Sequence, residues 1–181
     1  MHLQNIAKWS DQNLMQLNCQ KTKYMILNFC KSKKFQTRLS INNTLLEQVH
    51  ETRLLGLVIS EDLTWHSNTN SLVKRAYARM IILKRLYHFN LPKYQMVQIY
   101  ILYIRSITEQ SSVVWYSSIT KDEVCALERT QKVALKIIYQ NEYISYENAL
   151  SKANLQTLSQ RRKILLYRFL FKNPKKPKLH T

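Results

Sequence analysis

The pattern of hydrophobic and polar positions along the chain changes its period near residue 62. Before this point most apolar side chains alternate with polar ones, which is typical of short strands. Asn42 and Asn43 separate two such segments, and asparagine tolerates the positive φ of a tight turn. We expect a short helix over residues 3–14, followed by a small antiparallel β meander. The expected strands are residues 22–29, 37–41, 44–49 and 52–60.

After residue 62 the apolar positions recur at helical spacing. Residues 65–89 carry an apolar stripe that includes Leu72 and Met80, which predicts an amphipathic helix. Pro92 can open the next helix, to about residue 111, because its missing N–H costs nothing in a first turn. That helix is apolar on almost every side, so we expect it to be central. Three further helix starts are predicted at the capping residues Thr120, Ser145 and Thr157.

These patterns predict an α+β chain with three parts. Residues 1–62 hold the short helix and the meander. Residues 63–172 form an all-α bundle of about four to five helices. Residues 173–181 form a basic tail that we expect to be disordered.

The net charge of +17 is large for 181 residues and is unevenly distributed. Residues 63–108 hold seven Lys and Arg and no acidic side chain, and residues 148–181 hold nine and none. Such blocks favour a polyanionic partner, although a basic run can also be a solvated face. On the helix over residues 65–89, the side expected to lie opposite the apolar stripe carries Lys74, Arg75, Arg79 and Arg85.

The composition argues against several kinds of catalytic site. Cys19, Cys30 and Cys125 are widely spaced and the five histidines are scattered, so the pattern predicts no metal site and a reducing, intracellular setting. One glycine in the whole chain leaves no phosphate-binding loop. No apolar segment is long enough to span a bilayer, so we expect no membrane partner, and we identify no small-molecule substrate site.

The single glycine, Gly56, lies inside the apolar run of residues 54–59, LLGLVI. Glycine within a strand indicates a bulge or a close approach by another backbone. The alternative is plain strand packing. The tryptophans Trp65 and Trp115 are likewise more typical of a core than of a base-stacking surface.

Five segments, taken in order, resemble a known family. Residues 14–23, LMQLNCQKTK, resemble motif D of reverse transcriptases, and residues 54–59 resemble the following motif E. Three later segments resemble those of LINE-type (non-LTR, jockey-like) retrotransposon reverse transcriptases: LTW at 63–65, SVVW at 112–115 and LERTQKVA at 127–134. The resemblance covers about residues 1–172 and is to the C-terminal part of such an enzyme.

The resemblance implies a partial palm over residues 1–62 and a thumb-like bundle after it. Motif E of the family is a β-hairpin, the primer grip, which holds the 3′ end of the primer; Leu55 and Gly56 match it. Lys21 matches the motif D lysine, which is a proposed proton donor to the departing pyrophosphate. The alternative is that Lys21 is a solvated loop lysine. The expected partner is an RNA–DNA hybrid or another nucleic acid bound through its phosphates, with the fingers and palm segment as a further partner.

The departures from the family are also informative. The metal-binding aspartates of the family lie upstream of motif D. We therefore expect no cofactor in this chain and Mg²⁺ only in a complete enzyme. We also expect no polymerisation by the chain alone. Leu54 replaces the usual tyrosine of motif E. The alternative is a stand-alone nucleic-acid-binding or helical interaction module, or a degenerate remnant. The basic segment 172–178 resembles a nuclear-import signal, which leaves nucleus and cytoplasm both open.

Overall fold

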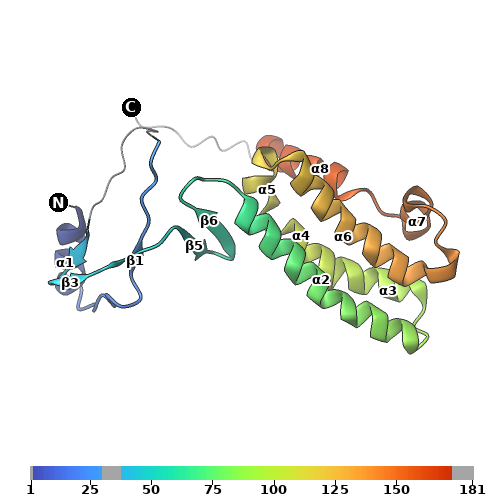
Figure 1. Cartoon of the computed structure of the whole chain (residues 1–181), viewed down its shortest axis with the longest axis horizontal. Coiled ribbons are helices and arrows are strands. Elements are labelled where there is room, and N and C mark those ends of the chain that lie inside the picture. Colours follow the sequence, from blue (N-terminus) through green and yellow to red (C-terminus); the bar gives the residue numbers. More distant parts are fainter. Residues whose placement is uncertain (1, 30–37, 173–181) are drawn as a thin grey trace. The chain divides into compact units, whose positions relative to one another are not determined.

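The computed structural model describes residues 2–29 and 38–172 and divides the chain into two compact units, Met1–Thr64 and Trp65–Thr181. The order of elements, a short helix and small strands followed by helices, confirms the predicted α+β class (Figure 1). The described residues do not include Cys30 or the basic tail at 173–181. Most of the segment that resembles a nuclear-import signal lies within that tail.

The first unit begins with helix α1, His2–Gln12, and continues with strands of two to four residues. The strands are β1 (Lys23–Tyr24), β2 (Ser40–Ile41), β3 (Thr44–Leu45), β4 (Glu47–Gln48), β5 (Glu51–Leu54) and β6 (Leu57–Ser60). They form three separate pairs, β1 with β4, β2 with β3 and β5 with β6. The β2–β3 hairpin turns at Asn42 and Asn43, with φ of 48° and 60°, as the sequence predicts.

The prediction of a single antiparallel meander is wrong, because the strands form three separate pairs and one of these pairs is parallel. The strand predicted over residues 22–29 is reduced to β1, which pairs in parallel with β4. Beyond it, Leu27 and Phe29 are exposed. Alternating apolar side chains form a stable strand only where a neighbouring strand and a covered face are present. Among the described residues of this unit the buried apolar side chains are Ile41, Leu46 and Leu57, so its core is small.

The second unit is entirely helical in its described part. Its main helices are α2 (His66–His88), α3 (Lys93–Ile99), α4 (Ser106–Glu109), α5 (Ser112–Trp115), α6 (Lys121–Tyr139), α7 (Tyr146–Ala153) and α8 (Leu158–Lys172). A π-helical segment, η1 (Tyr100–Arg105), joins α3 to α4 without a break. The predicted bundle thus corresponds to α2, the continuous helix over 93–109, α6, α7 and α8, with α5 added.

The helix starts follow the predicted capping chemistry. Thr120 and Glu123 form a complete capping box at α6, and Ser145 accepts the N–H of Asn148 at α7. Thr157 accepts the N–H of Gln160, while the Gln160 amide oxygen accepts the N–H of Thr157, so α8 begins with a second box. Each box satisfies N–H groups that have no partner within their own helix.

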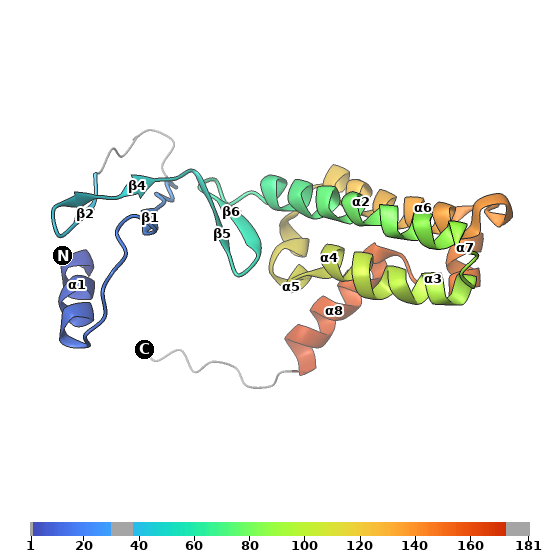
Figure 2. The same cartoon turned by 90° about the horizontal axis from the view of Figure 1, so that it is seen from below.

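The core of the second unit lies between α2, the helix over 93–109, α6 and α7. α2 and α6 pack side by side in both views (Figures 1 and 2). The central position expected for the helix over 93–109 is confirmed, since Met96, Tyr100 and Ile104 are almost fully buried. Trp115 is fully buried as well and donates its ring N–H to the Gln110 carbonyl at 2.9 Å, so it is a core residue.

Candidate nucleic-acid interface

Leu55 and Gly56 form the turn of the β5–β6 hairpin. Leu54 pairs with Leu57 across the turn, and φ is 49° at Leu55 and 85° at Gly56. Two successive positive φ values are the mark of the type I′ turn, which suits the twist of a two-residue hairpin. The expected unbroken strand over residues 52–60 is therefore wrong, and Gly56 is a turn residue. Glycine fits this conformation because it has no Cβ.

Leu55 is an unusual residue for the first turn position. The residue is 91% exposed, and a non-glycine residue at positive φ is strained by about 1 kcal/mol. Nothing within the described part of the chain compensates for this strain by burying the side chain. The hairpin thus presents an apolar side chain and a bare backbone at its tip.

Lys21 lies in a different part of the first unit. It belongs to the turn that precedes β1, where its N–H donates to the backbone and side-chain oxygens of Asn18, both at 3.1 Å. Its side chain is exposed. Lys21 thus precedes a strand of the β1–β4 pair, whereas Gly56 belongs to the separate β5–β6 pair.

The four predicted basic residues of α2 fall into two groups. Lys74 and Arg85 are exposed, whereas Arg75 is half-buried and donates from Nη1 to Gln110 Oε1 at 3.3 Å. Arg79 is exposed, but it donates from Nη1 to the Tyr103 carbonyl at 2.8 Å and lies over the Tyr103 ring. The prediction that all four lie opposite the apolar stripe is wrong. At about 100° per residue, Arg75 and Arg79 flank the stripe and reach the neighbouring helix.

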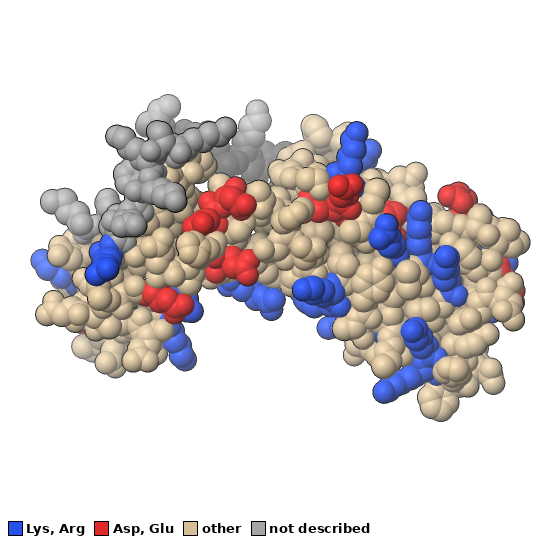
Figure 3. Space-filling model, in the orientation of Figure 1, with Lys and Arg blue, Asp and Glu red and all other residues tan. Residues whose placement is uncertain are grey.

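Lys84, which the sequence reasoning omitted, is exposed too, and like Lys74 and Arg85 it forms no hydrogen bond to another helix within the described ranges. We call Lys74, Lys84 and Arg85 the α2 basic surface. No ion pair of the described residues involves any of the three. On the face drawn in Figure 3, several Lys and Arg side chains project from the helical unit. The signal for Lys84 was available, because it adjoins Arg85 in the same acid-free block.

The acidic side chains of this unit are largely engaged within the fold. Glu123 closes the capping box of α6 and lies 2.9 Å from His66 Nδ1. Burial opposes its ionisation, but hydrogen bonds from Thr120 and His66 outweigh that effect and lower the pKa of Glu123. Glu142 is paired with Lys93, which lowers the pKa of Glu142. These carboxylates therefore do little to offset the exposed lysines and arginines of α2.

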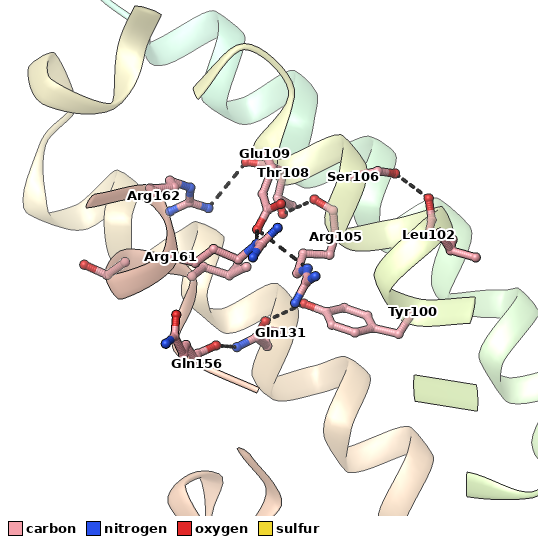
Figure 4. A network of polar contacts seen from close by, with 12 residues as sticks. Tyr100, Leu102, Arg105, Ser106, Thr108, Glu109, Gln131, Gln156, Arg161 and Arg162 are labelled. Carbon is pink, nitrogen blue, oxygen red and sulfur yellow. Dashed lines mark hydrogen bonds and ion pairs between the residues drawn. The ribbon is translucent and has the colours of Figure 1, made fainter. Parts of the chain in front are cut away.

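The segment that resembles the family's LExxQ motif has a structural role here. Gln131 accepts the hydroxyl of Tyr100 at 2.7 Å and donates to the Gln156 carbonyl at 2.9 Å (Figure 4). It also donates to Tyr146 Oη at 2.9 Å. Glu128 accepts the Tyr146 hydroxyl and the first N–H groups of α8. Burial, aided by Glu128, raises the pKa of Tyr146, so the hydroxyl stays protonated. The motif thus connects α6 to η1, α7 and α8.

A group of arginines on η1 and α8 was not singled out by the sequence reasoning. Arg105 and Arg161 both approach Glu109 Oε1 (Figure 4). Arg162 is almost fully buried and lies over the rings of Trp115 and Tyr116. Burial lowers the pKa of both Arg105 and Arg162, opposed mainly by Glu109 at Arg105 and by Glu128 at Arg162. The only sequence signal was the pair Arg161-Arg162 directly after a predicted cap.

Within residues 2–29 and 38–172, no group of three or more His, Cys, Asp or Glu side chains could hold a metal ion. No helix in these ranges is both long and apolar enough to cross a membrane. Comparison of the chain with protein-family models, with curated proteins and with solved structures found no match.

Proposed function

We propose that this chain is the primer-grip and thumb region of a LINE-type reverse transcriptase and holds an RNA–DNA hybrid through its phosphates. The observation that carries the proposal is the α2 basic surface: Lys74, Lys84 and Arg85 are exposed and take part in no ion pair of the described residues. Exposed cations spread along one helix match a polyanion that is bound without sequence readout. The resemblance of five ordered segments supplies the identity of that polyanion.

The β5–β6 hairpin supports the same proposal. Motif E of the family is a hairpin, and the matching residues Leu55 and Gly56 form a two-residue hairpin turn. A strained and exposed apolar residue is retained more readily where it contacts a partner. In this proposal Leu55 packs against the end of the primer strand, and Gly56 lets the backbone come close to it.

The salt dependence of hybrid binding tests the proposal. The full chain is titrated against a fluorescent RNA–DNA hybrid at several salt concentrations, and affinity is read from anisotropy. Three to five phosphate contacts predict a log–log slope of about −3 to −5, with equal affinity for hybrids of unrelated sequence. A flat salt dependence contradicts the proposal. Primer extension in the presence of Mg²⁺ is measured separately. In this proposal the chain holds the hybrid and does not itself catalyse extension.

A second candidate function, a helical interaction module, is favoured by one observation. The C-terminal half of α8 exposes Tyr167, Phe169, Leu170 and Phe171. Contiguous exposed apolar side chains are typical of protein-binding surfaces. Concentration-dependent self-association, measured by sedimentation, together with no hybrid binding at low salt, would favour this function over nucleic-acid binding.

A further inference from the structure

An open cleft lies between η1, the connection from α7 to α8, and α8 itself. Its volume is about 440 Å³, and the polar side chains that line it are Arg105, Asn154, Gln156, Arg161 and Arg168. Three guanidinium groups from two helices thus line one cavity. The cleft is separate from the α2 basic surface, since none of the residues lining it belongs to α2.

Two of the three guanidinium groups are held in place by one carboxylate. Arg161 donates from Nε to Glu109 Oε1, and Arg105 Nε lies 3.6 Å from the same oxygen (Figure 4). The Arg105 side chain is only 10% exposed. Its placement follows from the π-helical turn of η1, which closes over five residues, so that Tyr100, Ile104 and Arg105 all lie on the buried side. Arg105 cannot swing out of the cleft as a surface arginine would.

The charges in the cleft do not balance. Three guanidinium groups line the cleft, whereas Glu109 pairs with only two of them, Arg105 and Arg161, and Arg105 Nε forms no hydrogen bond in the described chain. The buried charge of Arg105 is therefore only partly compensated, by Glu109 at 3.6 Å, and an anion in the cleft would stabilise it further. Arg168 is exposed at the cleft and forms no ion pair among residues 2–29 and 38–172. Guanidinium groups bind phosphate oxygens through pairs of parallel N–H donors, and a rigid buried arginine is well suited to this role.

We propose that this cleft is a phosphate-binding site, in which Arg105 and Arg161, fixed by Glu109, hold the oxyanion and Arg168 closes over it. The inference rests on the proposed function only for the source of the phosphate, a phosphodiester of the bound hybrid. A free phosphate offers the same chemistry, so the test uses both. Binding here would add a contact on the α8 side of the unit that α2 does not provide.

The test follows the arginine side chains directly by NMR. The Nε–Hε signals of Arg105 and Arg161 are recorded in the ¹⁵N-labelled full chain during titration with inorganic phosphate at constant ionic strength, and then with the RNA–DNA hybrid. Both ligands are expected to move these two signals. Arg168→Gln should weaken phosphate binding about tenfold, and Arg129→Gln, an equal change of charge at an exposed site on α6, should leave it unchanged.

The outcomes separate this inference from the proposed function. If the hybrid binds but neither ligand moves the signals of Arg105 and Arg161, the site is refuted while the proposed function stands. If phosphate moves them and the hybrid does not bind, the site stands and the proposed function fails. If Arg168→Gln and Arg129→Gln weaken phosphate binding equally, the effect is one of net charge and the site is refuted. Arg168 is exposed, so its substitution leaves the fold intact.

Discussion

Glu128, within α6, accepts the backbone N–H of Leu158, thirty residues later, at 3.1 Å. Leu158 is the first residue of α8, and the other oxygen of Glu128 accepts the next N–H, that of Ser159. A carboxylate at a helix N-terminus satisfies otherwise unpaired donors and interacts favourably with the helix dipole. The N-terminus of α8 is therefore bonded to a side chain in the middle of α6, and not only to residues of its own segment.

We predict that Glu128→Ala destabilises the helical unit by about 2–4 kcal/mol, because it leaves the Tyr146 hydroxyl and two backbone N–H groups without their charged acceptor. Urea unfolding followed by far-UV circular dichroism measures the change. The control is Arg129→Ala, the exposed neighbour on α6, which should change the stability by no more than about 0.5 kcal/mol. Equal effects of the two substitutions would show that Glu128 does not connect the helices.

Glu123 gives the helical unit a pH-dependent contribution to stability. Because its pKa is lower in the folded protein than the ordinary value of 4.5, the stabilisation is fully present above about pH 4.5 and is lost as the pH falls through the folded value. We predict that Glu123→Gln costs about 1 kcal/mol at pH 7, and that the gap from the unsubstituted chain closes as the pH is lowered. Unfolding by urea at several pH values measures the gap. A gap that stays constant down to pH 3 would contradict this assignment.

The helix boundaries of the second unit could be predicted because they depend on local chemistry. A capping residue such as Thr120 or Ser145 bonds to a backbone group three residues away, so the signal and its consequence lie in one short segment. The Asn42-Asn43 turn is local in the same sense.

The features that could not be predicted depend on distant partners or on an unfavourable local choice. The pairing of β1 with β4 joins segments more than twenty residues apart and has no sequence signature. The turn at Leu55 places a leucine where asparagine is preferred, so the pattern indicated a continuous strand. The π-helical turn of η1 changes which side chains face inward, and an α-helical wheel therefore misplaces Arg105.

The β5–β6 hairpin should become more stable when its turn is changed to the preferred residues. Leu55→Asn creates an Asn-Gly turn and relieves a leucine held at a φ of 49°, so we predict a gain of about 0.5–1 kcal/mol. Gly56→Ala should cost about 1 kcal/mol, since φ is 85° there. Hydrogen exchange of the hairpin amides measures both changes.

The same turn substitution separates stability from binding. If Leu55 contacts the primer end, Leu55→Asn should weaken hybrid binding while it protects the hairpin amides more strongly. Leu45→Asn is the matched control, because Leu45 is an exposed leucine of the β2–β3 hairpin in the same unit. If Leu55→Asn binds the hybrid with unchanged affinity, the hairpin tip is not part of the proposed interface. The interface would then rest on the α2 basic surface.

The two groups of basic residues on α2 should respond differently to loss of charge. Lys74 and Arg85 are exposed and unpaired within the described ranges, so Lys74→Gln with Arg85→Gln should change stability by less than about 0.5 kcal/mol. If both contact phosphates, the salt slope of hybrid binding should become shallower by about 2. Anisotropy titrations at several salt concentrations measure the slope, and urea unfolding measures the stability.

Arg75 and Arg79 make contacts between helices, so removing their charge should act first on the fold. Arg75→Gln with Arg79→Gln removes the bonds to Gln110 and Tyr103 and should cost about 1–2 kcal/mol. Both double variants remove two positive charges, so a mere effect of net charge would change their salt slopes equally. A larger loss of slope in the Lys74 and Arg85 variant, together with a larger loss of stability in the other, would show that contacts within the fold decide which cations of α2 are available to a nucleic acid.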